Sequence, residues 1–253
     1  MIKSNYTPPD TIFKFVCPEI LIKILDNSSL NFTPPNSFND PYDCYLGLIS
    51  FAVTQKAIDR IKNDRTISDE IKVKMLKDLE ENPHELPDAL NQITNDLLLK
   101  SGITCFSLKR ENMLMWSHYA KKHTGACIEF HSIPLIESLT NNGKTKVNVN
   151  EVTYRSELGT INFHESPKVA VDNLVFTKAE DWSYEKEFRV LLVNENGLKS
   201  FDLKTIVSIT FGTKCPDSIV SQSKTLLEQK NTYPKFYKAR LAPKQFHLIF
   251  DSI

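Results

Sequence analysis

The stretch ITCFSLKRENMLMWSHYAKKHTGACIEF, residues 103–130, contains strand-like and helix-like segments in close succession. Its beginning and its end have the apolar and β-branched composition of strands, whereas Met115, Trp116 and Tyr119 lie between them at helical spacing. A strand, a helix and a second strand within one short span predict a mixed fold, in which helices flank a sheet.

The charges around the middle of this stretch predict the ends of its helix. Glu111 suits the N-terminal end of a helix dipole, and Lys121 and Lys122 suit the C-terminal end. Gly125 is a typical residue for stopping a helix. We therefore expect the helix to extend from Glu111 to Gly125.

The rest of the chain mixes strand and helix patterns without a regular β-α-β rhythm. Strands are expected in TIFKFV, LNFTPP, KVNVNEVTYRS, EKEFRVLLV, SFDLKTIVSITFG, KFYKARL and FHLIFDSI, and helices in CPEILIKILDN, SPKVAVDNLVFTKA and PDSIVSQSKTLLEQKN. From about residue 51 to 101 the sequence is helical and charged, which predicts two or three helices. We expect one α+β domain over residues 1–253, with a mainly antiparallel, split or twisted sheet, flanking helices and an inserted helical lobe at 51–101.

Composition argues against several classes of protein. The 31 basic residues balance the 31 acidic ones, so no overall field attracts nucleic acid or an anionic membrane. The N-terminal MIKSNYTPPD lacks the apolar stretch of a secretory signal, and no run of about 18 apolar residues is present to span a membrane. Five widely spaced cysteines without a C-x-x-C pair indicate reduced thiols. We expect a cytoplasmic protein without a membrane partner.

The glycines and histidines argue against common cofactor sites. The seven glycines form no dinucleotide-binding fingerprint, P-loop or nucleophile elbow. His118 and His123 are five residues apart and would diverge on a helix, and the other histidines have no ligand partner at suitable spacing. No metal site is expected.

The segment MWSHYA carries groups that hydrogen-bond, stack and titrate. A helix with Trp116, His118 and Tyr119 suits the lining of a pocket. The alternative is a half-buried helix, in which Trp116 and Tyr119 anchor the sheet and His118 is simply hydrogen-bonded. The sequence leaves both interpretations open.

The segment WSYEKEFRV pairs two carboxylates. If EKEFRV is a strand, Glu185, Glu187 and Arg189 share one face. A solvent-facing row of charges is one interpretation. The preceding Trp182 and Tyr184 favour another, because apolar walls around paired carboxylates shift their pKa values as acid and base chemistry requires.

Three segments, SFNDPYDC, CFSLKRENMLMWSHYAKKHTG and WSYEKEFRV, follow an IFKF first strand in this order. Together they resemble a widespread bacterial family known only as a domain of unknown function. More distantly, the chain resembles the DNA-targeting ADP-ribosyltransferase toxins of the DarT type, which implies an ADP-ribosyltransferase-like fold and NAD as substrate. The toxins carry histidine and threonine where this chain has Lys14 and Val16.

The toxin resemblance also implies roles for particular residues. Glu187 would be the catalytic glutamate, Glu185 the first glutamate of an E-x-E motif, and Arg110 a contact to NAD phosphate or the reacting nucleotide. The residues implied to bind NAD are Lys14, Asn39, Asp40, Ser107, Trp116, His118, Tyr119 and Tyr184.

Three functions follow from these patterns. The first is an NAD-consuming enzyme that transfers ADP-ribose to nucleic acid or protein, or hydrolyses NAD, as a bacterial toxin or phage-defence effector with an antitoxin or regulatory partner. The second is a ligand-binding or effector module without turnover. The third is RNA cleavage with His118 as acid or base, which the neutral net charge favours least.

Overall fold

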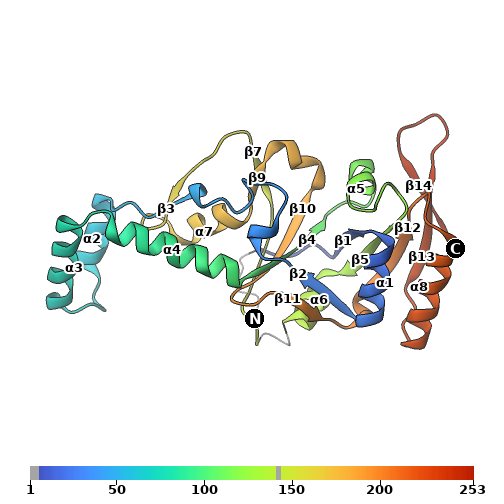
Figure 1. Ribbon diagram of the computed structural model, residues 1–253, viewed down its shortest axis with the longest axis horizontal. Helices are drawn as coiled ribbons and strands as arrows, with labels where there is room; N and C mark the ends of the chain where they lie inside the picture. Colours follow the sequence, from blue (N-terminus) through green and yellow to red (C-terminus); the bar gives the residue numbers. More distant parts are fainter. Residues whose placement is uncertain (1–5, 141–143) are drawn as a thin grey trace.

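A central sheet of eight strands forms the body of the protein (Figure 1). The computed structural model describes residues 6–140 and 144–253, so the first five residues of the N-terminal stretch considered above lie outside the described part. The strand order is β14-β13-β12-β5-β1-β4-β10-β6. The pair β12 and β13 is parallel, whereas the other neighbouring strands of this sheet are antiparallel. The predicted α+β class with a mainly antiparallel sheet is confirmed.

The bounds of these eight strands follow the alternating segments of the sequence. They are β1 Thr11–Val16, β4 Gly102–Ser107, β5 Ala126–His131, β6 Val147–Glu151, β10 Glu187–Leu192, β12 Ile206–Phe211, β13 Lys235–Leu241 and β14 Leu248–Ser252.

Three two-stranded sheets accompany the central sheet. They pair β2 Ser29–Phe32 with β11 Gly197–Ser200, β3 Ile49–Ser50 with β8 Ile161–Asn162, and β7 Thr153–Arg155 with β9 Thr177–Ala179. The last pair is parallel and places Tyr154 beside Lys178. The short helical turns are η1 Pro35–Ser37, η2 Leu46–Leu48, η3 Glu180–Glu185 and η4 Leu203–Thr205.

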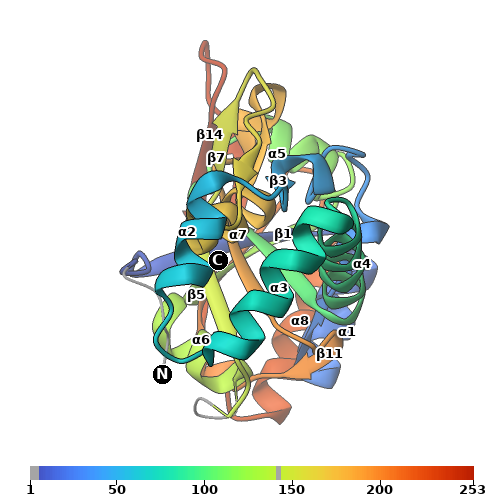
Figure 2. The same ribbon diagram turned by 90° about the vertical axis from the view of Figure 1, so that its left-hand side faces the viewer.

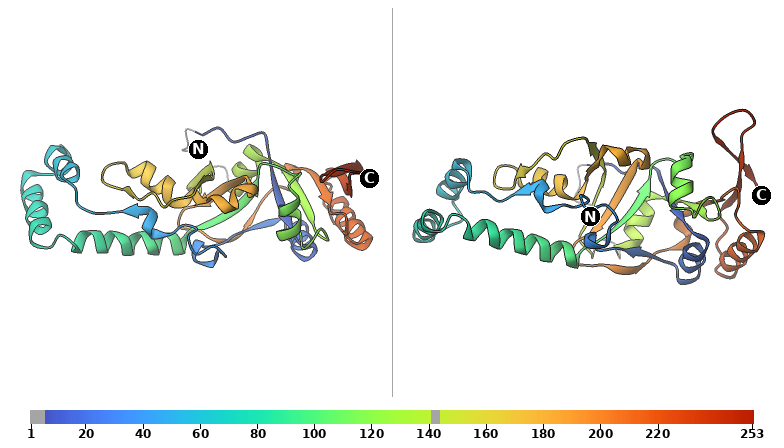
Figure 3. Two further views of the ribbon diagram at one scale, coloured as in Figure 1. Left: turned by 90° about the horizontal axis from the view of Figure 1, so that it is seen from above. Right: turned by 45° about the horizontal axis from the view of Figure 1, so that its top comes forward.

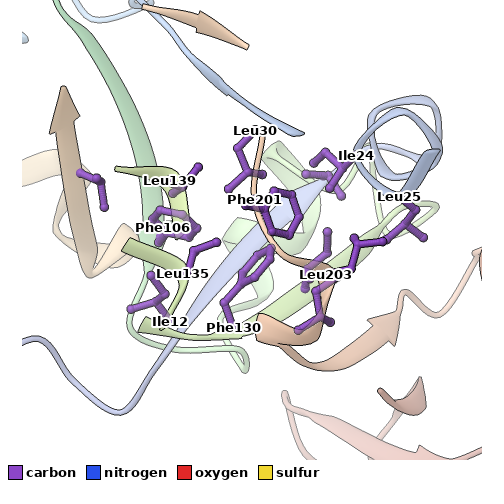
Figure 4. Packing of buried hydrophobic residues seen from close by; sticks show 14 of the residues in the cluster. Ile12, Ile24, Leu25, Leu30, Phe106, Phe130, Leu135, Leu139, Phe201 and Leu203 are labelled. Carbon is purple, nitrogen blue, oxygen red and sulfur yellow. The ribbon is translucent and has the colours of Figure 1, made fainter. Parts of the chain in front are cut away.

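One face of the central sheet carries the largest apolar core. Helices α1 Pro18–Asn27, α6 Ser132–Leu139 and α8 Asp217–Gln229 contribute buried side chains to it. Ile12, Phe106 and Phe130 meet there from three neighbouring strands (Figure 4). Full burial of a side chain of this size contributes roughly 1.5–3 kcal/mol to stability. Because side chains alternate along a strand, residues that flank Phe106 and Phe188 point to the opposite face.

That second face carries two smaller apolar clusters. One contains Phe15 of β1 and Trp116 of helix α5 Met113–His118. The other contains Ile103 and Leu191 beneath helix α7 Pro167–Val175. Polar side chains at the start of β10 lie on the same face of the sheet, since Glu187 pairs with Ser107 of β4.

The sheet opens between β1 and β4. Strand β1 pairs with β5 from Thr11 to Val16, but its register with β4 contains only the pair Phe13 and Ser107. Beyond this pair no register is recorded between the two strands, although β1 and β4 remain neighbours in one sheet. Backbone groups of β4 at this opening need other partners.

Three helices form an arm that projects from the body (Figures 1 and 3). They are α2 Gln55–Asn63, α3 Asp69–Glu81 and α4 Glu85–Lys100, and they lie in the charged segment where two or three helices were predicted. Figure 2 shows α2 and α3 in front of the sheet when the molecule is viewed along the arm. No residue of α4 is buried, which is consistent with its solvated sequence.

The predicted helix from Glu111 to Gly125 is wrong at its C-terminal end. Helix α5 ends at His118, and the three residues Lys121, Lys122 and His123 have positive φ angles of 46°, 57° and 68°. This left-handed turn brings Gly125 against β1, where a Cβ atom would overlap the carbonyl oxygen of Val16. Gly125 is therefore needed for close strand approach and does not stop the helix.

The prediction that Glu185 lies on strand EKEFRV is also wrong. Glu185 ends the turn η3, and Lys186 has a φ of 45°, so β10 begins at Glu187. The backbone is held there by β4, because Ser107 Oγ donates to the Glu185 carbonyl at 2.7 Å and Leu108 N donates to the Lys186 carbonyl at 2.8 Å.

Two further sequence features can be placed in the structure. The five cysteines are free thiols, as predicted. In the described ranges, no helix is both long and apolar enough to cross a membrane.

Candidate functional site

Arg189 is the centre of a buried network of charges on the second face of the sheet. Its side chain is 0% exposed. Its guanidinium donates to both carboxylate oxygens of Asp43 at 2.7 Å, to both of Glu187 at 2.7 and 3.2 Å, and to the Val175 carbonyl at 2.7 Å. These bonds use all five guanidinium N–H groups. Arg189 therefore fixes the position of other groups and has no donor left for a ligand.

Lys178 joins this network from strand β9. Its ammonium lies 2.7 Å from Glu185 Oε2, 3.3 Å from Glu187 Oε2 and 3.7 Å from Asp43 Oδ2. Burial opposes its charge, but the attraction of Glu187 and Glu185 outweighs burial and raises the pKa of Lys178. Tyr154, beside Lys178 in the β7 and β9 pair, accepts a hydrogen bond from Glu187 N at 2.8 Å. The small parallel sheet thus places two partners of Glu187.

The two glutamates have opposite pKa shifts. Burial alone would raise the pKa of Glu187, but Arg189 and Lys178 lower it to about 2. Burial raises the pKa of Glu185 above the ordinary value, although Lys178 and the Tyr119 hydroxyl, which donates to Glu185 Oε1, oppose the shift. Glu187 is therefore ionised at neutral pH, and Glu185 takes up a proton more readily. Separation of this kind distinguishes the acid and base roles of paired carboxyl groups in enzymes.

Both glutamates lie on the wall of a cavity of about 250 Å³. The cavity is located where the sheet opens between β1 and β4, and the apolar clusters beneath α5 and α7 both contribute to its walls. Its lining includes Phe13, Lys14, Phe15, Asn31, Thr33, Phe38, Asn39, Asp43, Thr104, Cys105, Ser107, Met115, Tyr119, Lys178, Glu185 and Glu187. The cavity combines aromatic surface with charged groups, as binding sites for small molecules do.

Several predicted site residues are brought together here. Lys14, Asn39, Ser107 and Tyr119 line the cavity with the two glutamates, although these residues are far apart in the sequence. Ser107 is held in place, because its hydroxyl donates to backbone carbonyls, including that of Glu185.

Other predicted site residues lie elsewhere. The guanidinium carbon of Arg110 lies 4.4 Å from the centre of the Phe250 ring. Trp116 is fully buried and packs edge to face against Phe15 at 5.2 Å, so it anchors the sheet and exposes no surface for stacking. Neither Arg110 nor Trp116 lines the cavity. Trp116 differs in this respect from Tyr119, which does line it.

The remaining three predicted contacts are also outside the cavity lining. The exposed His118 ring lies 6.0 Å from the Tyr184 ring. Asp40 is buried within its own loop, and its Oδ1 accepts from Tyr42 N at 2.9 Å.

Sequence reasoning missed Asp43, Lys178 and Tyr154. Asp43 belongs to the quoted segment SFNDPYDC, so its carboxylate was visible as part of an ordered loop. Lys178 and Tyr154 had no such signal, because only the pairing of β7 with β9 brings them to the glutamates. Within residues 6–140 and 144–253, no group of three or more His, Cys, Asp or Glu side chains is arranged to hold a metal ion.

Comparison with known families finds a match to one segment of the chain. Residues 115–190 match the profile of a family described as Protein of unknown function (DUF2971). The matched segment contains Tyr119, Lys178 and both glutamates of the cavity, as well as Arg189. No curated protein and no solved structure matches the chain.

Proposed function

We propose that the cavity is the active site of an enzyme that cleaves the bond between nicotinamide and ribose in NAD, transferring ADP-ribose to a nucleic acid, a protein or water. The observation that carries this proposal is the pair of glutamates with opposite pKa shifts on one cavity wall. Breaking a glycosidic bond develops an oxocarbenium cation. Enzymes that catalyse this step commonly use two carboxyl groups in different protonation states.

Each glutamate has a defined role in the proposed reaction. When the glycosidic bond breaks, its electron pair goes to the nicotinamide nitrogen, and nicotinamide leaves uncharged. Glu187, held ionised by Arg189, stabilises the positive charge that develops on the ribose. Glu185 takes the proton from the attacking hydroxyl or water. Its raised pKa brings its basicity nearer to neutral pH, where a general base is most effective.

The size and lining of the cavity suit one end of the dinucleotide. At about 250 Å³ it is smaller than the roughly 300–1,000 Å³ of sites for drug-sized ligands. It therefore suits the nicotinamide half of the molecule, with the remainder of NAD extending outward. Phe13, Phe15 and Tyr119 supply aromatic surface for the pyridine ring, a role for which Trp116 is too deeply buried.

The proposal is tested by measuring nicotinamide release from NAD by mass spectrometry. Purified protein is incubated with NAD alone and with added DNA, RNA or cell lysate. Release that requires one added polymer identifies the acceptor, and release without any polymer identifies NAD hydrolysis. The absence of release under all these conditions, from protein shown to be folded, would refute the proposal.

A ligand-binding module without turnover is the second candidate. It is favoured by the completeness of the charge network, in which Arg189 has no free donor and Lys178 contacts three carboxylates. Such a network also makes a rigid pocket wall. A rise in melting temperature with NAD, without any nicotinamide release, would favour this candidate. RNA cleavage by His118 gains no support, because His118 lies outside the cavity lining.

A further inference from the structure

Lys14 occupies the opening between β1 and β4. Its ammonium donates to Thr104 Oγ1 and to the Cys105 carbonyl, each at 2.9 Å, and lies 5.1 Å from the centre of the Phe106 ring. The carbonyl bond satisfies a backbone group of β4 where the ladder with β1 is interrupted. Both hydrogen-bond partners are neutral, so they offset none of the positive charge.

The two lysines of the cavity have different surroundings. Lys178 lies within 4.0 Å of three carboxylates. In the described part of the chain, Lys14 forms no ion pair with any carboxylate. An ammonium has three N–H donors, and the two hydrogen bonds of Lys14 leave one unused. Burial lowers the pKa of Lys14, although Cys105 and Glu187 oppose this shift. A half-buried cation that no carboxylate contacts directly is costly to maintain, and an anionic ligand would lower that cost.

The lining of the cavity also contains neutral polar groups. Asn31, Thr33 and Asn39 contribute amide and hydroxyl groups to the lining, and Asn31 Nδ2 donates to Thr33 Oγ1 at 3.0 Å. The acidic side chains Asp43, Glu185 and Glu187 are gathered around Lys178 and Arg189. The cavity thus has a carboxylate side and an unpaired ammonium.

We propose that Lys14 is an anion-binding residue of the cavity, which holds a phosphate group of a nucleoside diphosphate ligand. The choice of a dinucleotide rests on the proposed function. NAD is positive at its pyridine ring and negative at its diphosphate, so its charge complements carboxylates on one side and an ammonium on the other. Lys14 would thereby fix which end of the dinucleotide reaches Glu187.

The proposal is tested by calorimetric binding of two probes. ADP-ribose retains the diphosphate and lacks nicotinamide, whereas nicotinamide riboside lacks phosphate. We expect Lys14→Met to weaken ADP-ribose binding about tenfold or more, which is the effect of one charge-assisted hydrogen bond, and to leave nicotinamide riboside binding unchanged. Lys23→Met, at an exposed lysine of α1, is the matched control and should change neither.

Two further measurements separate anion binding from a structural role of Lys14. Lys14→Arg keeps a positive charge at this position, so it should retain most of the ADP-ribose binding that Lys14→Met loses. Equal weakening by Lys14→Arg and Lys14→Met would mean that the charge of Lys14 does not hold the ligand, and would overturn the proposal. For the wild-type protein, affinity for ADP-ribose should fall as salt rises, more steeply than affinity for nicotinamide riboside. Equal salt dependence of the two probes would also overturn it.

The outcomes distinguish this proposal from the proposed reaction. Lys14-dependent binding of ADP-ribose without any nicotinamide release from NAD would refute the reaction and leave the anion site intact. Nicotinamide release, together with an ADP-ribose affinity that Lys14→Met leaves unchanged, would refute the anion site alone. Failure of the wild-type protein to bind ADP-ribose would overturn the anion site.

Discussion

Replacing Arg189 with methionine should destabilise the protein strongly, because it leaves buried carboxylates without their main partner. Methionine has a similar length and no charge, so Arg189→Met removes five hydrogen bonds with little change in volume. Among the described residues, Asp43 and Glu187 would keep only Lys178 as a cationic partner within 4.0 Å, and Lys178 already contacts Glu185.

The magnitude follows from the pKa of Glu187. The difference between the ordinary value of 4.5 and about 2 in the folded protein corresponds to about 3 kcal/mol of favourable interaction with the ionised carboxylate. Arg189 supplies the largest part of it, followed by Lys178 and Cys105. Removing one partner of a buried ion pair generally costs about 3–5 kcal/mol. We therefore expect Arg189→Met to lower the free energy of unfolding by about 3–5 kcal/mol at pH 7.

The loss should depend on pH. A carboxyl group with a lowered pKa in the folded state contributes stability above its unfolded pKa, and this contribution disappears as pH falls through the folded pKa. For Glu187 this window extends from about 4.5 down to about 2. The difference between the wild-type protein and Arg189→Met should therefore shrink as pH falls through this window, since a protonated Glu187 no longer requires Arg189.

Urea denaturation at a series of pH values measures both effects. The matched control is Arg240→Met, because Arg240 Nε lies 2.6 Å from Asp251 Oδ2 in an ion pair of similar length that is half exposed. An exposed pair contributes about 1 kcal/mol or less. Equal losses in Arg189→Met and Arg240→Met, or a loss in Arg189→Met that is the same at pH 7 and pH 3, would contradict the role assigned to Arg189.

Four other substitutions test the charges of the cavity and the packing of the sheet by urea denaturation. Glu187→Gln should lower the free energy of unfolding by about 3 kcal/mol at pH 7, because it removes a carboxylate whose pKa is lowered by its partners. Glu185→Gln should lower it by about 1 kcal/mol or less, because glutamine keeps an acceptor for Tyr119 and the pKa of Glu185 is raised. Equal costs would contradict the assigned difference between them. Gly125→Ala should lower the free energy of unfolding by about 1–3 kcal/mol, since its Cβ would overlap a β1 carbonyl. An unchanged stability would show that β1 can shift to make room for the Cβ. Trp116→Ala should cost about 3–5 kcal/mol, and a cost below 1 kcal/mol would contradict its role in the core.

Periodicity in the sequence was sufficient to predict most of the fold. Alternation identified TIFKFV and apolar composition identified ACIEF, and these segments form the neighbouring strands β1 and β5. The charged segment 51–101 contains three helices, as expected. These signals are local, and each depends on which face of one element is buried.

Tertiary contacts decided the two places where local patterns failed. The sequence around Lys122 has no breaker before Gly125, yet the helix ends early because the chain must turn to place Gly125 against Val16. The alternation of EKEFRV was interrupted at Lys186, because its carbonyl bonds to Leu108 of a distant segment. Neither contact can be read from spacing alone.

The candidate site was predictable where charged residues stood out together. The E-x-E pair was found from its aromatic neighbours, and both of its glutamates line the cavity. The environment of each glutamate was not predictable. Lys178 is brought to them by the pairing of β7 with β9. Asp43 is brought to them by its contact with Arg189, which lies 146 positions further along the chain. Arg110 illustrates the opposite case, because its sequence position suggested a ligand contact and its guanidinium packs on Phe250.

The most direct test of the account is the rate of nicotinamide release from NAD by four proteins: the wild type, Glu185→Gln, Glu187→Gln and Glu180→Gln. Glu180 lies at the exposed start of the turn that ends in Glu185, so Glu180→Gln is a matched control. The account predicts that the wild type and Glu180→Gln release nicotinamide at similar rates, and that folded Glu185→Gln and Glu187→Gln lose at least about a hundredfold, the usual contribution of such groups. Wild-type rates from both cavity variants, or no release by the wild type with any acceptor, would contradict it.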